Sequence, residues 1–269
     1  MLQFRFAARS ETGHVRANNE DAGFAGPYLL CVADGVGGAE AGEVAAATTA
    51  YVVSARSLAH PGHEPARLLG AAVRQAHTEL AAGIAADPRR TGMATTLTAV
   101  LTDGRRTALA QVGDSRAYLL RDGELSQLTH DQTLVQSMVD SGQLTPEQAA
   151  ASPLRSMVLQ AVDGEHVPEP DLLLLDLRPR DRLLLCSDGV SDVLSPDAIG
   201  SCLRLGSRTA AVDRLLGSAL DGGSRDNVTA IVADVVDAPA IVAAGLVLGA
   251  AWDLGNVVDP AAVRPLRSA

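Results

Sequence analysis

Two short apolar runs in this chain echo each other, and each ends in Asp-Gly. The first covers Leu29–Val36 and the second covers residues 183–190. A continuous apolar run of this length, bounded by turn signals, is typical of a buried β-strand. Each strand should carry one carboxylate, Asp34 or Asp188, out of the core at its end, and the glycine after it lets the chain turn away. Two unpaired buried carboxylates are costly, so a divalent metal ion between them is the simplest expectation.

Elsewhere the pattern alternates clusters of helix with clusters of strand. Helices are expected at 39–59, 64–86, 133–141, 146–151 and 210–220, and strands at 24–33, 94–102, 107–112, 117–120, 125–128, 172–177, 182–186 and 228–236. Short connections with Asp-Gly turns favour antiparallel hairpins, and strands 172–177 and 182–186 are expected to form a further pair. Thr145, Pro146 and Gln148 make a capping-box pattern at one helix start. These elements predict an α+β fold with two antiparallel sheets face to face and helices outside.

The domain organisation is expected to be simple. No linker, repeat array or low-complexity run divides the chain, so one domain is expected over residues 1–240, with an apolar tail over 241–269. The apolar stretch 238–252 is too short for a membrane span, which needs about 18 or more residues. We expect it to form a final strand and a tail packed on the domain, with a clipped membrane anchor as the alternative. No signal peptide is expected at the N-terminus.

The composition narrows the possible functions. A net charge of −10 argues against nucleic acid as the main partner, because phosphate-backbone binding needs a basic surface.

Hydrophobic residues make up 47% of the chain but aromatic residues only 3%, so the core must be built from Ala, Val, Leu and Ile. Two of the three cysteines, Cys31 and Cys186, lie inside the echoed strands. They are expected to be reduced, buried thiols of a cytosolic protein.

Further acidic residues belong with the two strand-end carboxylates. Glu20 and Asp21 precede the first echoed strand, Asp114 lies between two strands, and Asp226 enters the last strand. The other four Asp-Gly pairs, at 103, 122, 163 and 221, are expected to be plain turns. Oxygen ligands without clustered His or Cys favour Mg²⁺ or Mn²⁺ over Zn²⁺. Two such ions about 3.5–4 Å apart can activate water for in-line displacement at phosphorus.

At this point the chain resembles a known family, the metal-dependent Ser/Thr protein phosphatases, called PPM or type 2C. The matching blocks are SETGHVRANNED (10–21), VADGVGG (32–38), GMATT (92–96), VGDSRAY (112–118), LTHD (128–131), LCSDG (185–189) and DNVT (226–229). They follow the family order across nearly the whole chain. Their sequences are most similar to those of single-domain bacterial members, particularly from actinobacteria, which reverse the phosphorylation made by Ser/Thr kinases.

The resemblance implies a four-layer α-β-β-α sandwich. It also implies a metal site for two Mn²⁺ or Mg²⁺ ions, with room for a third. Asp34 resembles the carboxylate that bridges both metals, and the Gly35 carbonyl resembles a ligand of the second. Asp188 and Asp226 resemble ligands of the first. Asp114 resembles the ligand of a third, weaker ion, which it shares with Asp188.

The resemblance also implies supporting and substrate-binding roles. Glu20 and Asp21 resemble residues that support the cluster through metal-bound water. Arg16 resembles the guanidinium that grips the substrate phosphate, which suits its planar fork. Val36 stands where many eukaryotic members have a histidine, so a metal-bound water is expected to donate the proton to the leaving group. Segment 133–164 resembles the mobile flap beside the site.

A family member of this type is expected to act on phosphorylated proteins, including Ser/Thr kinases and their substrates, as a cytoplasmic monomer without nucleic acid or membrane partners. One alternative is a non-catalytic phosphoprotein-binding pseudophosphatase, although Arg16, Asp34, Asp188 and Asp226 are all retained. A second is a phosphatase that acts on an anti-sigma-factor antagonist. Such phosphatases usually carry a sensor domain, and we do not expect this chain to have room for one. A third is a structural protein with calcium-stabilised loops, which would need Asp/Asn-rich loops instead of strand-end carboxylates.

Overall fold

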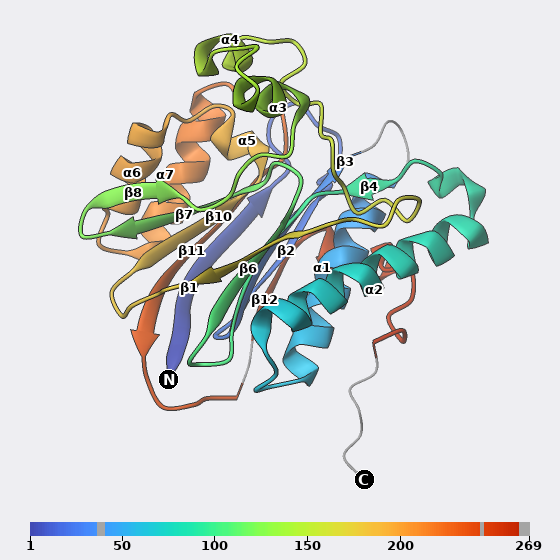
Figure 1. The fold of residues 1–269 in the computed structure, drawn as a ribbon, viewed down its shortest axis with the longest axis horizontal. Helices are drawn as coiled ribbons and strands as arrows, with labels where there is room; N and C mark the ends of the chain where they lie inside the picture. Colours follow the sequence, from blue (N-terminus) through green and yellow to red (C-terminus); the bar gives the residue numbers. More distant parts are fainter. Residues whose placement is uncertain (37–40, 243–244, 264–269) are drawn as a thin grey trace.

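The computed structural model describes residues 1–36, 41–242 and 245–263. Two antiparallel β-sheets face each other, and helices cover the outer side of each (Figure 1). The first sheet contains, in spatial order, β1 (Leu2–Glu11), β11 (Val228–Asp237), β10 (Arg182–Cys186), β7 (Arg116–Arg121) and β8 (Glu124–Gln127). The second contains β12 (Leu246–Gly249), β2 (Asp21–Ala25), β3 (Leu29–Val36), β5 (Leu97–Thr102), β6 (Thr107–Val112) and β9 (Asp171–Leu175), with β4 (Ala94–Thr95) paired to β3.

The helices complete the four layers. The outer side of the second sheet is covered by α1 (Gly42–Ala59) and α2 (Pro65–Ala86), and that of the first by α5 (Asp188–Ser191), α6 (Pro196–Leu203) and α7 (Arg208–Asp221). Figure 1 shows the short helices α3 (Leu134–Asp140) and α4 (Pro146–Ala150) at one end of the sandwich. The expected α+β fold, a four-layer α-β-β-α sandwich, is confirmed.

Three hydrophobic clusters fill the three spaces between the layers. The central cluster lies between the sheets and includes Leu30 and Val32 of β3 with Leu183 and Leu185 of β10. The residues that alternate with these in β3 belong to the cluster under α1 and α2, and those in β10 belong to the cluster under α6 and α7. Both faces of the two echoed strands are therefore buried, which explains why each reads as a continuous apolar run.

Local signals for turns and helix ends agree with expectation. Thr145 and Gln148 form the capping box of α4, with both reciprocal hydrogen bonds present. The hairpin between β7 and β8 turns through Asp122 and Gly123, both at positive φ, which is the conformation that a two-residue hairpin favours. These features depend on residues that are close together in the chain, so the sequence alone predicts their positions.

The expected pairing of strands 172–177 and 182–186 is wrong. β9 pairs with β6 in the second sheet, whereas β10 pairs with β11 and β7 in the first. Between them the chain crosses from one sheet to the other at a turn closed by Asp181, whose carboxylate accepts hydrogen bonds from the Arg178 backbone and the Arg121 guanidinium. An apolar pattern indicates that a strand is buried, but it does not identify the strand beside it.

Other elements also differ from expectation. β1, α5 and α6 were not expected, and the expected strand at 24–33 is a hairpin formed by β2 and β3. β1 pairs with β11 from end to end, but charged residues such as Arg5 and Arg9 interrupt its apolar pattern. β3 also continues past Asp34, because Gly35 and Val36 pair with β4. Asp34 therefore lies inside a strand and not at its end.

The C-terminal part of the chain joins the second sheet. The expected final strand is confirmed at Leu246–Gly249, which pairs antiparallel with β2. Positions 37–40, expected to hold part of a motif and of the first helix, and positions 243–244 and 264–269 of the tail, lie outside the described residues. Across the described parts of the chain, no helix combines the length and the apolar character needed to cross a bilayer. The three cysteines are free and buried, as expected.

The layered core generates a first prediction. Leu185 is fully buried between the sheets, whereas Leu174 on β9 is 73% exposed. Leu185→Ala should lower the free energy of unfolding by about 2–5 kcal/mol, because it removes buried apolar surface and leaves a cavity. Leu174→Ala should change it by less than about 0.5 kcal/mol. Urea denaturation of both variants measures the difference, and equal effects would contradict the assigned core.

Candidate active site

Asp34 and Asp21 face each other across two neighbouring strands. Their Cα positions are register partners in the antiparallel pair β2–β3. Thr96 fixes the backbone of Asp34: its Oγ1 accepts from the Asp34 N–H at 3.0 Å, and its own N–H donates to the Asp34 carbonyl at 2.9 Å. The Thr95 hydroxyl donates to the same carbonyl at 2.8 Å. The backbone that carries Asp34 is thus held by three hydrogen bonds besides its strand pairing.

Asp188 reaches the same region from the other sheet. It begins α5 directly after β10, with Ser187 as the N-cap residue. The Ser187 hydroxyl donates to Asp21 Oδ2 at 2.8 Å and accepts from the Thr229 N–H at 3.1 Å. Ser187 therefore ties together the end of β10, the start of β11 and the carboxylate of β2. The other oxygen, Asp21 Oδ1, is buried and has no hydrogen-bond partner among the described residues.

The glycines of the two Asp-Gly pairs have a different role from the one expected. Neither Gly35 nor Gly189 is among the glycines at positive φ. A Cβ on Gly189 would lie 2.0 Å from the Asn227 carbonyl oxygen, and a Cβ on Gly35 would lie 2.4 Å from the Gly42 carbonyl oxygen. These positions need glycine because another backbone segment approaches closely, and not because the chain turns there.

Asp226 and Arg16 form an ion pair at the rim of the site. Arg16 Nη2 lies 2.7 Å from Asp226 Oδ2, and the Arg16 side chain is 48% exposed. The hydrogen bond and the charge of Asp226 raise the pKa of Arg16, and the charges of Glu20 and Asp34 add to this, although burial opposes it. Arg16 is thus a cation that the structure places beside these carboxylates.

Asn227 holds the loop that carries Arg16 and Glu20. Its Nδ2 donates to the carbonyl oxygens of Thr12 and Asn18, both at 2.9 Å, and its Oδ1 accepts from the Glu20 N–H at 2.8 Å. The side chain is buried, at 4% exposure. Asn227 belongs to the DNVT block (226–229), but the sequence alone indicates no role for it. Its three partners lie more than 200 positions away in the chain, so no local signal could have identified them.

Asp114 and Glu20 complete the set of acids. Asp114 is buried in the connection between β6 and β7, after Gly113 at φ +96°. The Glu20 carboxylate and the Gly35 carbonyl both lie beside Gly42, where a Cβ would come within 2.6 Å of Glu20 Oε2 and 3.2 Å of the Gly35 oxygen. The absence of a side chain at Gly42 therefore leaves these two oxygen groups room on one side.

Repulsion between the acids is visible in their pKa values. Burial, followed by the charges of Asp21, Asp188, Asp114 and Asp226, raises the pKa of Asp34 well above its ordinary value. Burial is also the largest cause of the pKa shifts of Asp21, Asp114 and Asp188. The pKa is raised to about 7 for Asp21 and Asp114 and to about 6 for Asp188. Neighbouring carboxylates add to each of these shifts. Close carboxylates in a poorly solvated place are stabilised by a cation.

The donor set fits a hard divalent cation. All the donors are oxygen atoms, one of them is the unpartnered Asp21 Oδ1, and Gly42 leaves open the space beside Glu20 and the Gly35 carbonyl. Such oxygen donors are the preferred ligands of Mg²⁺ and Mn²⁺. Within the described residues, no group of three or more His, Cys, Asp or Glu side chains is arranged so that it could hold a metal ion directly. The acids approach one another, but the assignment of individual ligands stays a prediction.

Two cavities open beside the acids. One, of about 510 Å³, is lined by Arg16, Asp188, Asp192, Arg225 and Asp226 among others. The second, of about 340 Å³, lies between Asp114 and the helices α3 and α4. Arg155 lines both. A phosphorylated side chain entering the first cavity would meet both carboxylates and guanidinium groups.

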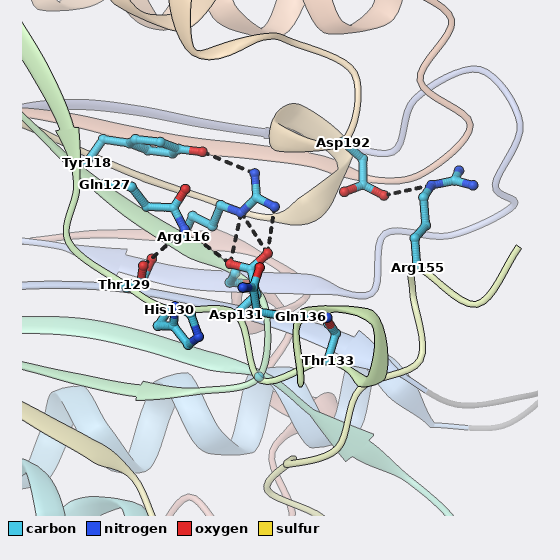
Figure 2. Close-up of polar contacts among 12 residues, drawn as sticks. Arg116, Tyr118, Gln127, Thr129, His130, Asp131, Thr133, Gln136, Arg155 and Asp192 are labelled. Carbon is cyan, nitrogen blue, oxygen red and sulfur yellow. Dashed lines mark hydrogen bonds and ion pairs between the residues drawn. The ribbon is translucent and has the colours of Figure 1, made fainter. Parts of the chain in front are cut away.

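The segment over the second cavity is anchored on either side by ion pairs, as Figure 2 shows. Arg116 Nε and Nη2 bind the Asp131 carboxylate at 2.9 and 2.5 Å, at the base of the segment. Arg155, from the chain after α4, points toward Asp192 at the end of α5, with 3.3 Å between Nε and Oδ2. Asp192 lies one turn of helix after Asp188, so this contact places segment 133–164 next to the acids.

The clamp formed by Asn227 generates a second prediction. Asn227→Ala leaves the Glu20 N–H and two loop carbonyls without their partners, so it should lower the free energy of unfolding by about 2 kcal/mol or more. Amide hydrogen exchange at Glu20 should also become faster. Asn256→Ala is the matched control, because Asn256 makes one amide hydrogen bond, to Ala250. If both variants leave exchange at Glu20 unchanged, Asn227 does not hold this loop.

Known proteins share both the sequence and the fold. The sequence profile of the family described as protein phosphatase 2C matches residues 13–215. The chain is 48% identical over 236 residues to the serine/threonine protein phosphatase PstP of Mycobacterium tuberculosis, a match that covers 88% of this chain but 46% of that protein. This chain thus spans about half the length of that relative.

One further relative, and one solved domain structure, are matched over most of their length. The serine/threonine phosphatase stp of Listeria monocytogenes is 30% identical over 244 residues, covering 84% of this chain and 94% of that protein. A solved structure of the catalytic domain of PstP in complex with two manganese ions aligns with a TM-score of 0.82 and 46% identity, covering 88% of this chain and all of that one. This chain therefore belongs to the protein phosphatase 2C family.

Proposed function

We propose that the chain is a metal-dependent protein serine/threonine phosphatase that hydrolyses phosphoserine and phosphothreonine esters. The observation that carries this proposal is the convergence of Asp21, Asp34, Asp114 and Asp188, whose pKa values are raised by burial and by neighbouring carboxylates, beside the ion pair of Arg16 and Asp226. Membership of the family and the 48% identity with a named phosphatase support it. A cavity of about 510 Å³ at this place gives the substrate room.

The metal ligands are proposed from the resemblance to the family, on the acids that converge here. Asp34 would bridge two Mn²⁺ or Mg²⁺ ions, with Asp188 and Asp226 on the first ion and the Gly35 carbonyl on the second. Glu20 and Asp21 would support the ions through water, and Asp114 would share a third with Asp188. Two divalent ions, when bound, supply a strongly acidified water and positive charge for the phosphoryl oxygens. The manganese ions of the related catalytic domain support this choice of metal.

Arg16 is proposed to bind the substrate phosphate. One of its terminal nitrogens donates to Asp226, and about half of the side chain is exposed at the cavity. The remaining N–H groups of a guanidinium can form two parallel hydrogen bonds to phosphate oxygens, which fixes the phosphorus relative to the acids. Arg155 and Arg225 line the same cavity and add positive potential for an anionic substrate.

The partners and location are proposed together with this activity. We propose that the substrates are phosphorylated proteins, including Ser/Thr kinases and their targets, and that the enzyme acts in the cytoplasm as a monomer. Segment 133–164, anchored by Arg155 and Asp192 next to the cavity, would contact the residues that flank the phosphorylated position. The net charge of −10 disfavours nucleic acid as a partner.

The proposed reaction gives a third prediction. Purified protein should release phosphate from a phosphothreonine peptide with Mn²⁺ or Mg²⁺ and should lose this activity in EDTA. Asp34→Asn should lower the rate by about 100-fold or more, because metal ions contribute several kcal/mol to the stabilisation of such transition states. The control is Asp176→Asn, whose side chain is 80% exposed and paired with Arg178.

The outcomes separate the competing functions. Loss of activity in Asp34→Asn with an unchanged melting temperature supports a catalytic metal site. Loss of stability in the same variant, with no phosphatase activity in the parent protein, would indicate a structural metal instead. A folded parent protein that binds the phosphopeptide without releasing phosphate would be a pseudophosphatase.

Arg16 gives a fourth prediction. Arg16→Ala should lower kcat/KM for the phosphopeptide by about 10- to 100-fold, the loss expected for hydrogen bonds to a charged group. Arg16→Lys keeps the charge but not the fork, so it should recover only part of the loss. Steady-state kinetics on the three proteins measures this order. Full recovery by lysine would show that Arg16 acts only through its charge.

A further inference from the structure

A further cavity lies where the outer face of the first sheet meets the connection between α6 and α7. Its volume is about 710 Å³, and it is lined by the starts of β1 and β10, the ends of β7 and β11 and the turn between β7 and β8. Figure 1 shows the β7–β8 hairpin and α6 on one side of the molecule, with α3 and α4 at the top. The cavity shares no residue with the two cavities beside the acids, so it is separate from the proposed active site.

The lining of this cavity carries an excess of positive charge. Five of its side chains are arginines and three are aspartates. The chain as a whole has a net charge of −10, so the cavity is a local reversal of the overall charge. The charged side chains of the lining are Arg5, Arg180, Arg182, Arg204, Arg208, Asp122, Asp234 and Asp237.

Two of the arginines are committed to the fold. Arg182, whose side chain is 12% exposed, binds both oxygens of Asp234. It also donates to the carbonyl oxygens of Leu203 and Leu205. Arg208 donates from Nη1 to the same Asp234 carboxylate at 2.7 Å. These bonds hold the connection between α6 and α7 against β10, so this wall of the cavity is formed without a ligand.

The aspartates leave part of the positive charge uncompensated. Asp234 is shared by two guanidinium groups, and Asp237 binds the N-terminal ammonium of Met1 at 2.5 Å. Asp122 is exposed in the β7–β8 turn and forms no ion pair within the described parts of the chain. A single free carboxylate therefore faces the three remaining arginines of the lining.

Two of these three arginines have a guanidinium without a partner. Arg204 donates from Nε and Nη2 to the Gly123 carbonyl. Arg5 and Arg180 are exposed, and neither guanidinium makes a hydrogen bond or an ion pair among the described residues. A guanidinium presents N–H donors in a plane that matches two oxygens of a phosphate group. The two free groups are therefore suited to an oxyanion.

The backbone brings these two arginines to the same part of β11. Arg5 on β1 is the register partner of Asp234. The Arg180 N–H donates to the carbonyl of the next residue, Val235, at 2.9 Å. One arginine thus comes from the strand beside β11 and the other from the turn before β10, and both line the cavity.

The conformation of Arg180 supports a role for its side chain. It lies at φ +83°, a region that glycine adopts freely and that is unfavourable for other residues. Within the described structure, no hydrogen bond or ion pair of the guanidinium offsets this strain. Backbone strain of this kind is concentrated at sites that hold ligands.

Apolar side chains complete the lining. They belong to Leu120, Pro179, Leu203 and Leu205 among others, and Leu205 is 37% exposed. A phosphate group fills only a small part of about 710 Å³. The cavity therefore also has room for an organic body beside the charged groups.

We propose that this cavity binds a small organic molecule that carries a phosphate group. Arg5 and Arg180 donate to the phosphate oxygens, and the leucines beside them contact the organic body. The ligand supplies the negative charge that the three aspartates of the lining do not provide. This site does not depend on the proposed phosphatase activity, because the two sites have no residue in common.

The test uses phenylphosphonate, a stable analogue of a phosphate ester, and benzyl alcohol, a similar body without charge. Each is titrated into ¹⁵N-labelled protein in the presence of Mg²⁺, and amide chemical shifts are followed. Phenylphosphonate should give saturable changes around residues 180–182, 204–208 and 234–236, and benzyl alcohol should not. Changes around the acids report any binding at the proposed active site separately.

The double variant Arg5→Gln, Arg180→Gln should weaken phenylphosphonate binding at this cavity by about tenfold or more, because it removes hydrogen bonds to a charged group. Its melting temperature should match that of the parent protein, since neither guanidinium contributes a bond to the fold. Any shifts around the acids should be unchanged.

The matched control is Arg67→Gln. Arg67 on α2 is also exposed, with no ion pair of its guanidinium in the described structure, but it lies outside the cavity. This variant should bind phenylphosphonate like the parent protein. Three results would overturn the proposal: no saturable shifts at the cavity with phenylphosphonate, equal shifts with benzyl alcohol, or an equal loss of binding in the control and the double variant.

Discussion

The mutual repulsion of acids gathered at one end of the sandwich is the constraint on which the rest of the structure depends. Asp21, Asp34, Asp114 and Asp188 come from four separate chain segments, and burial with neighbouring charge raises each pKa. Left to themselves, such groups would move apart into water. They stay together because their backbones are fixed by strand pairing and by hydrogen bonds, and because Ser187 also holds the Asp21 carboxylate. The layered core thus provides the rigidity that the site requires.

The residues around the acids show how that rigidity is achieved. Thr96 holds the backbone of Asp34, Ser187 links Asp21 to the end of β10, and Asn227 fixes the loop before β2. Each of these side chains joins segments that are distant in sequence. Gly35 and Gly189 serve the same purpose in another way, because a side chain there would prevent close backbone contact. Support of this kind keeps reactive groups in place when their own interactions are unfavourable.

The sequence predicted features that depend on local pattern or on burial. The two echoed strands were recognisable because both of their faces are buried, and the capping box at Thr145 needs only neighbouring residues. The separation of β9 and β10 into different sheets was not predictable, since both are apolar and only the crossing at Asp181 decides their partners. β1 was missed because its charged positions hide a strand that is defined by pairing with β11.

For the site, sequence identified the acids but not what holds them. Acidic residues at strand boundaries are visible in the chain, and the structure brings Asp34, Asp188 and their neighbours together. The roles of Ser187 and Asn227 depend on contacts across the fold, for which the chain gives no local pattern. The ion pair between Arg16 and Asp226 is of the same kind, because 210 positions separate the two residues.

Strand β3 connects the two ends of the molecule and sets how far they can influence each other. Its first residue follows Tyr28, at the end of the sandwich away from the acids, and it ends with Asp34, Gly35 and Val36 at the acids. It is paired with β2 on one side and with β5 and β4 on the other, and both its faces are covered. A strand held in this way has one arrangement, and a ligand shifts an equilibrium only when it binds two states differently. We therefore expect β3 to keep Asp34 in one geometry whatever binds at the other end of the sandwich.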